Sequence, residues 1–135
     1  MSTDSQWAVQ QAVYAALAGD GALMALVAGV HDHPPEGAAP FPYVLIGEST
    51  ARDWSGAAAE GMELTLTLHA WSRYRGFREV KAILAAIHSA LHDATLALAG
   101  QTLVNLRFDF AATMRDPDGL TTHGVARYRA VTQAT

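Results

Sequence analysis

The stretch "ELTLTLHAWSRYRGFREVKAIL", Glu63 to Leu84, decides the fold because its hydrophobic period changes halfway along. Up to Trp71, apolar and polar residues alternate, which predicts a strand with one face in the core. From Gly76 to about Asp93 the apolar residues recur every three or four positions, which predicts an amphipathic helix. We expect the apolar stripe of this helix to cover the leucine face of the strand. The residues concerned are Leu64, Leu66, Leu68 and Ala70 on the strand and Val80, Ile83, Leu84, Ile87 and Leu91 on the helix.

The segments on either side complete a single α+β domain spanning 1–135. Helical spacing is expected from about Ser5 to Ala18, followed by a shorter helix capped by Asp20. The proline-rich segment Gly29 to Pro42 is predicted to be a loop. Further strands are predicted around Tyr43–Thr50 and on both sides of the turn "RDPDG". The expected order is α-α-β-β-α-β-β, with an antiparallel four-stranded sheet covered on one face by helices.

Composition limits the kind of protein this can be. Only 16% of the 135 residues are charged, whereas an average soluble domain has about 25%. A surface with few charges suits a subunit whose surface is largely covered by neighbouring subunits. The chain has no cysteine, no apolar run long enough for a membrane span and no signal-peptide pattern at its start. We therefore expect a soluble protein made in the cytoplasm, with no membrane partner.

Charge is distributed unevenly along the chain. The first 65 residues contain eight acids and one arginine, whereas the remainder contains eight bases and five acids. Two opposed halves would suit head-to-tail association between copies. If the halves interleave in the fold, the asymmetry disappears in space, and the sequence leaves both outcomes open.

No motif predicts catalysis, a metal site or a cofactor. The sequence contains no "GxSxG", "GxGxxG" or "GxxxxGK[ST]" pattern. "HDH" at His31–His33, with Glu36, and the pair His88 and His92 carry metal-capable side chains, but neither group has clear further ligands. We interpret them as solvated or interface histidines, and we expect no enzyme.

The candidate interface residues are basic or aromatic. Arg73, Arg75 and Arg78 surround the start of the long helix, and Trp71 ends the strand before them. Trp54 lies in a flexible excursion between two strands. Each set also has an interpretation without a partner. The arginines could belong to a solvated turn, and the Trp54 ring could fold back onto its own sheet. Arg127 and Arg129 are expected on the sheet face that the helices leave open, where water or another subunit would meet them.

Four segments together resemble a known family. "PYVLIGES" from Pro42, the stretch from Glu63 to Asp93, "GQTLVNLRF" and the closing "HGVARYRA" are similar to small tail-completion proteins of long-tailed phages and of the gene transfer agents of alphaproteobacteria. The resemblance covers about Pro42 to Ala130. Its most specific piece is "LHAWSRYRG", which is a family-level pattern and not a catalytic signature.

This resemblance implies a tail terminator with an α+β fold and no catalytic residues. Such proteins form a ring, commonly of six subunits, on the last ring of the tail tube. They stop tube growth at the head–tail junction and present a surface to head-completion or connector proteins. DNA passes through the channel without sequence-specific binding. Another head–tail connector in the same particle, or a small ligand-binding domain or enzyme, remain the alternatives.

Overall fold

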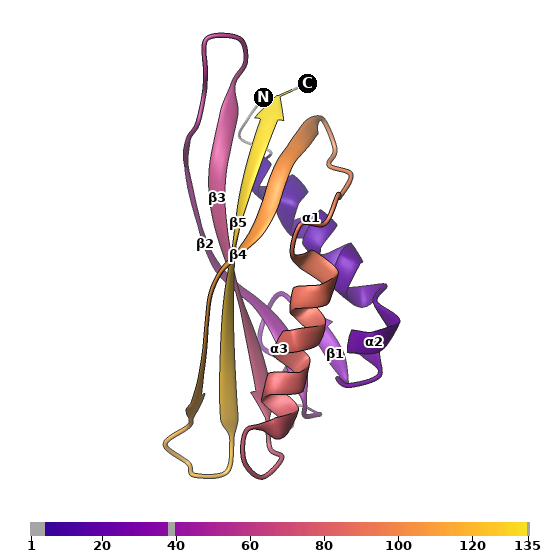
Figure 1. The fold of residues 1–135 in the computed structure, drawn as a ribbon. Helices are drawn as coiled ribbons and strands as arrows, with labels where there is room; N and C mark the ends of the chain where they lie inside the picture. Colours follow the sequence, from indigo (N-terminus) through magenta and orange to yellow (C-terminus); the bar gives the residue numbers. More distant parts are fainter. Residues whose placement is uncertain (1–4, 38–39, 135) are drawn as a thin grey trace.

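The computed structural model describes residues 5–37 and 40–134, and this part of the chain has an α+β fold (Figure 1). Residues 1–4, 38–39 and 135 of the predicted span 1–135 lie outside the described residues, and with them Asp4 of the charge count. The elements in chain order are α1 (Ser5–Ala18), α2 (Gly21–Met24), β1 (Gly29–His31), β2 (Tyr43–Asp53), β3 (Gly61–Ser72), α3 (Arg78–Leu91), β4 (Gln101–Arg115) and β5 (Thr122–Ala134).

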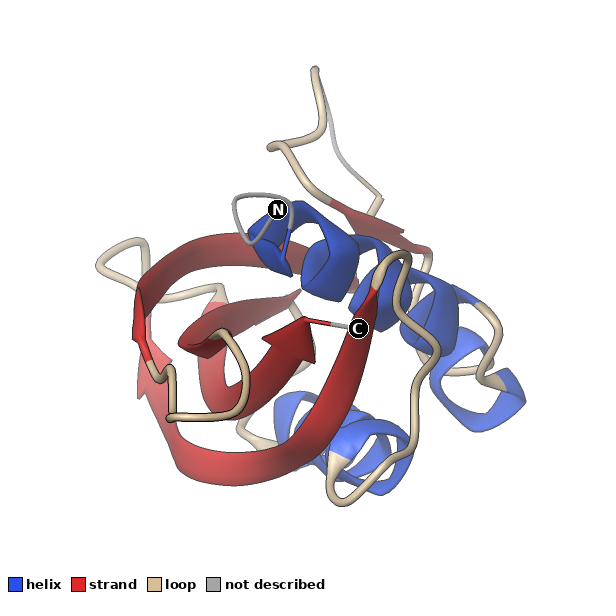
Figure 2. Cartoon of the chain, turned by 90° about the horizontal axis from the view of Figure 1, so that it is seen from above, coloured by secondary structure: helices blue, strands red, loops and turns tan. Residues whose placement is uncertain are grey.

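The sheet has five strands in the order β1-β2-β3-β5-β4. All pairs are antiparallel except β1 with β2, which is parallel. The predicted α+β class is therefore correct, but the predicted four-stranded antiparallel sheet and its element order are wrong by one strand. Figure 2 looks along the molecule and shows how strongly the sheet curls.

The strand missed by the sequence prediction is β1, in the segment predicted to be a loop. It is three residues long, too short to display a hydrophobic period, and it pairs with Tyr43–Leu45 at the start of β2. Pro34 and Pro35 follow shortly after it. Because proline has no backbone N–H to give to a ladder, β1 cannot continue along β2.

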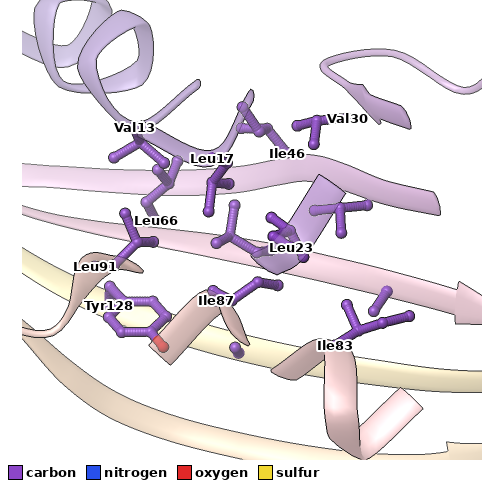
Figure 3. Packing of buried hydrophobic residues seen from close by; sticks show 14 of the residues in the cluster. Val13, Leu17, Leu23, Val30, Ile46, Leu66, Ile83, Ile87, Leu91 and Tyr128 are labelled. Carbon is purple, nitrogen blue, oxygen red and sulfur yellow. The ribbon is translucent and has the colours of Figure 1, made fainter. Parts of the chain in front are cut away.

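The core lies between the sheet and the three helices, as the opening stretch predicts (Figure 3). Leu64, Leu66, Leu68 and Ala70 of β3 are all buried, on the side of the sheet that α1 and α3 cover. Val9, Val13 and Leu17 of α1 join them, at the spacing of one helical stripe. From α3 come Val80, Ile83, Ile87 and Leu91, each fully buried, whereas Leu84 is only partly buried.

Strand β4 departs from the simple alternation that its sequence suggests. It is shifted in register against β5 between Leu103 and Asn105 and again between Phe108 and Phe110. Each shift inserts one residue, and an inserted residue moves the following side chains to the other face. Phe110 therefore lies beside Arg127 on the helix-free face, whereas unbroken alternation along β4 would place it on the same face as Leu106.

The two oppositely charged halves of the chain do not interleave in the sheet. The acidic half supplies β1, β2 and the first part of β3, whereas the basic half supplies β5 and β4. One side edge of the sheet therefore belongs to the acidic half and the other edge to the basic half. For the strands, therefore, the charge asymmetry of the sequence is also an asymmetry in space.

Candidate subunit and partner interfaces

The β3–α3 turn and the β4–β5 turn lie at the same end of the molecule (Figure 1). Five cationic side chains belong to these turns and to the ends of the elements beside them. All five are exposed. We call this set the basic end, and its members are Arg73, Arg75, Arg78, Lys81 and Arg115. The sequence predicted the first three as a cluster, and the fold adds the other two.

The β3–α3 turn is held by a short hydrogen-bond network at its base. Ser72 Oγ donates to Glu79 Oε1 at 2.6 Å and accepts from the backbone N of Tyr74 at 3.1 Å. Gly76 has a φ of 73°, a value that glycine adopts without the strain that other residues meet. The turn therefore reverses the chain within a few residues and leaves the side chains of Arg73 and Arg75 at its surface.

Three cations of the basic end lie against aromatic rings in cation–π contacts. The guanidinium carbon of Arg73 lies 4.5 Å from the centre of the Phe41 ring. The Phe77 ring has the Arg115 guanidinium at 5.0 Å and the Lys81 ammonium at 5.8 Å. Such contacts favour the charged groups where they lie without neutralising them. The carboxylates of Glu79, Asp116 and Asp118 in or next to the same turns offset part of this charge, so the basic end keeps a net positive charge that an acidic partner could meet.

The β4–β5 turn is stabilised by Asp118. Its carboxylate accepts hydrogen bonds from the backbone N of Leu120 at 2.8 Å and of Thr121 at 2.9 Å, and from the Thr121 hydroxyl at 2.8 Å. The backbone hydrogen bonds from Thr121 and Leu120 lower the pKa of Asp118. Arg73 Nε donates to the same hydroxyl at 3.2 Å, which ties the two turns together.

Arg127 and Arg129 lie on the helix-free face, as expected, but each has a partner within the chain. Arg129 forms an ion pair with Glu63 on the neighbouring strand. Arg127 lies 3.9 Å from the Asp109 carboxylate and stacks near Phe110, with 5.1 Å between its guanidinium carbon and the ring centre. This face is therefore polar and largely charge-balanced, unlike the basic end.

Trp71 belongs to a row of polar and aromatic side chains that crosses three strands of the helix-free face. Its ring stacks on His123 at 3.7 Å, with 8° between the planes. His123 Nε2 lies 2.8 Å from His69 Nδ1, and His69 Nε2 lies 2.9 Å from Glu48 Oε1. Burial, and secondarily the charge of His69, lower the pKa of His123, while the hydrogen bond from His69 lowers that of Glu48. The sequence reasoning missed this row because its members are far apart along the chain.

Trp54 lies at the opposite end of the molecule from the basic end, just beyond β2 (Figure 1). It is 44% exposed, and its ring lies beside Gly61, so it is half folded back onto its own hairpin. Trp7 and Tyr14, which the sequence reasoning did not single out, are also exposed on α1. They line a groove of about 500 Å³ with residues of β1 and β2, including Val30 and Ile46.

The histidines singled out as metal-capable have structural partners. The His88 and His92 rings stack 4.7 Å apart, and His92 Nδ1 accepts a hydrogen bond from the Phe108 backbone N at 3.0 Å. His33 Nδ1 lies 3.0 Å from the Asp32 carboxylate. In the part of the chain that the structure describes, no three His, Cys, Asp or Glu side chains are grouped to hold a metal ion. None of the described helices is long and apolar enough to cross a membrane.

Comparison with known proteins gives one family. The family model for tail completion protein gp17 matches residues 11–133. The tail completion protein gp17 of Bacillus phage SPP1 is 29% identical over 122 residues, which cover 90% of each chain. The solved structure of SPP1 gp17 superimposes with a TM-score of 0.66 at 27% identity, over 93% of this chain and 89% of that one.

A second solved structure is more similar in shape. A chain in the virion of a native gene transfer agent particle is 31% identical, with a TM-score of 0.89, over 96% of this chain and 97% of that one. The family model and these relatives cover nearly all of the described fold, including β3, the turn after it and α3. The chain therefore belongs to the family of tail completion protein gp17.

Proposed function

We propose that this chain is a tail terminator, a non-catalytic structural protein at the junction between tail and head of a phage or phage-like particle. In this role a ring, of six copies, sits on the end of the tail tube and stops its growth. The ring then joins the tail to head-completion or connector proteins, and DNA passes through its channel. The similarity over 96% of the chain to a component of a gene transfer agent virion is the observation that carries this proposal.

The surfaces of the chain support a role in assembly. Its two ends differ in character, because the basic end carries five exposed cations whereas the other end carries Trp54, the acids Asp53 and Glu60, and Arg52 as a single cation. A ring subunit between two different partners needs two unlike faces. The basic end would meet an acidic partner surface, where electrostatic attraction speeds association and sets orientation.

The helix-free face supports passage of DNA without sequence-specific binding. Arg127 and Arg129 of this face form ion pairs with Asp109 and Glu63, which reduces the charge that these two side chains can offer to phosphates. Tight binding of DNA depends on many unpaired cations that replace its counterions. A channel lined by this face would therefore let DNA slide through.

The proposal is tested by reversing charges at the basic end. Arg75→Glu together with Arg78→Glu is expected to weaken association with the ring or the tail tube, while the circular dichroism spectrum stays unchanged. Arg107→Glu is the control, since it also reverses an exposed arginine but one that faces Asp93 at 3.4 Å. Sedimentation of the purified variants, with and without tube protein, measures the effect. Unaltered assembly of the double variant would remove this surface from the mechanism.

Two further measurements separate this role from its alternatives. Labelling the protein on isolated tails and locating it by electron microscopy distinguishes a terminator at the end of the tube from another head–tail connector. A large thermal stabilisation by one metabolite or metal ion would instead favour a ligand-binding domain or an enzyme.

A further inference from the structure

Four side chains of the helix-free face form one connected row across β2, β3 and β5. The row runs from Glu48 through His69 and His123 to Trp71, and we call it the histidine row. Hydrogen bonds of 2.9 and 2.8 Å join its first three groups, and the His123 ring stacks on the indole at 3.7 Å. The His69 side chain is only 16% exposed. Because histidines gain protons between pH 8 and 5, the state of this row depends on pH.

The bond to Glu48 fixes where the protons lie while both rings are neutral. A lowered pKa keeps the Glu48 carboxylate ionised, so it can only accept hydrogen bonds. His69 therefore donates from Nε2, and its Nδ1 is left as an acceptor. His123 then donates from its own Nε2 to His69 Nδ1 across the 2.8 Å contact. In this arrangement both hydrogen bonds are made without any charge on the imidazoles.

The contact between the two histidines can hold one added proton but not two. A first proton can be taken up at His123 Nδ1, which takes no part in the contact, while His123 Nε2 still donates. A second proton would have to lie on His69 Nδ1, so that two N–H groups would face each other over 2.8 Å. The two imidazolium rings, with centres 5.0 Å apart, would also repel each other. The second proton therefore breaks the hydrogen bond.

Burial sets the pH range in which both rings become charged. Desolvation, and then the charge of His69, lower the pKa of His123 below the ordinary value of 6.5. The carboxylates of Asp116, in the β4–β5 turn, and of Glu48 act the other way but more weakly. The second step therefore needs a pH on the acid side of neutrality.

The other charged or titratable neighbours of the row come from β2, β4, β5 and the turn after β3. On β5, Arg127 acts on Glu48 and pairs with Asp109 of β4. On β2, Tyr43 lies across from the indole of the row, and burial raises its pKa, so its phenol stays neutral. Arg73, in the turn after β3, acts on Tyr43 in the opposite sense. In this surrounding the two histidines are the groups expected to change charge between pH 8 and 5.

Two added protons also change the charge around the row. Glu48, Asp109 and Asp116 against Arg127 give a charge of −2 while both imidazoles are neutral, and two protons cancel it. Acid therefore removes a local negative charge that repels anionic groups such as DNA phosphates.

We infer that the histidine row is a pH switch, in which acid separates His69 from His123 and releases the His123 ring from Trp71. Above the switch, the row ties β2, β3 and β5 together on the helix-free face. Below it, His69 keeps its ion pair with Glu48, while the His123 imidazolium turns towards water, because a partly buried charge without a partner is costly. An effect on DNA inside a ring rests on the proposed function, whereas the switch is a property of the single chain.

The Trp71 indole reports directly on the switch. The chain has three tryptophans, so Trp7→Phe with Trp54→Phe leaves this indole as the single fluorophore of its kind. Quenching of its emission by acrylamide is expected to rise about twofold between pH 7.5 and 5.0, because the stacked ring leaves it. His123→Gln, made in the same background, is expected to show no such rise. His88→Gln removes a histidine that stacks on His92 and is the matched control, expected to behave like the parent.

Nitrogen NMR of the histidine side chains supplies an independent test. On acidification the two rings of the row are expected to take up protons in separate steps, and the rise in Trp71 quenching should follow the second step. His69→Gln is expected to leave one step for His123, at a higher pH, because the neighbouring charge that lowers its pKa is gone. In that variant the protonated ring can still donate to the side-chain amide oxygen, so quenching is expected to stay low. Circular dichroism shows whether each variant is folded at both pH values.

The change of charge is tested with DNA. A short labelled duplex is expected to bind the wild type several-fold more tightly at pH 5.5 than at pH 7.5, because repulsion of its phosphates falls. The double variant His69→Gln with His123→Gln is expected to show a smaller gain, since the histidines outside the row titrate in both proteins. Equal gains would overturn the effect on DNA.

The outcomes separate the switch from the proposed function. Two protonation steps, with Trp71 released in the second, support the switch. Two charged rings without a change in Trp71 quenching overturn it, and so does an equal rise in quenching in the parent, in His123→Gln and in His69→Gln. These measurements use the free chain, so a failed switch leaves the terminator standing, and a chain that never joins a tail leaves the switch standing.

Discussion

Replacing Tyr128 by phenylalanine tests how much stability the core loses by burying a hydroxyl group that has no hydrogen-bond partner. The Tyr128 side chain is 2% exposed and packs against the Phe108 ring, with 5.7 Å between centres. Its hydroxyl is buried and has no hydrogen-bond partner among the described residues. Burying a hydroxyl without a partner costs about 1–3 kcal/mol on the basis of mutational data. We therefore expect Tyr128→Phe to raise the free energy of unfolding at pH 7 by about 1 kcal/mol.

The pH dependence of this variant can be worked out from the same burial. Desolvation raises the pKa of Tyr128 from 10.0 to about 12. Between these values the unfolded chain loses the phenol proton while the folded chain keeps it, so the wild type loses stability as the pH rises. At pH 11 the loss amounts to about 1.4 kcal/mol, and above pH 12 it approaches about 2.7 kcal/mol. The phenylalanine variant lacks this loss.

Urea unfolding of both proteins at pH 7, 9 and 11 measures the effect. The stability advantage of Tyr128→Phe is expected to be constant from pH 7 to 9 and to grow by about 1.4 kcal/mol at pH 11. Comparing the two proteins at each pH cancels the titration of the other tyrosines, including Tyr43, whose pKa burial also raises. An advantage that is equal at pH 7 and pH 11 would refute the reasoning, because it would mean that the hydroxyl ionises as easily in the folded state.

Two further substitutions test the helix-free face and the packing of α3. The wild type is expected to lose stability as the pH falls below about 6.5, because burial lowers the pKa of His123 and the unfolded chain therefore binds the proton first. His123→Gln is expected to make this loss smaller. Equal losses of unfolding free energy in both proteins between pH 7.5 and 5.5 would contradict this. Gly124→Ala places a methyl group 2.8 Å from Val80 Cγ2 and is expected to cost about 1–3 kcal/mol by forcing α3 away from the sheet. Gly56→Ala, which meets open space, is its control and is expected to stay within about 0.5 kcal/mol in thermal or urea unfolding.

The candidate surfaces were only partly predictable from the sequence. Arg73, Arg75 and Arg78 are close in the chain, so their clustering at the start of α3 could be predicted locally. Arg115 joins them only because two turns meet at one end of the sheet, and Trp71 meets His123 only because β3 pairs with β5. Contacts of this kind depend on strand order, which no local pattern encodes.

The sequence by itself determined those helices and strands that are long enough for their hydrophobic period to repeat. Four leucine-face positions in β3 and a helical stripe in α3 specify which sides become buried, since burial of apolar area is the dominant favourable term in folding. The short strand β1 and the inserted residues of β4 have no such period. Their placement depends on which strand lies beside them, and a single inserted residue moves Phe110 from the face of Leu106 to the helix-free face. Only the tertiary structure decided, therefore, which edges of the sheet stay open, because an edge is defined by the absence of a neighbour and not by the residues of the strand alone.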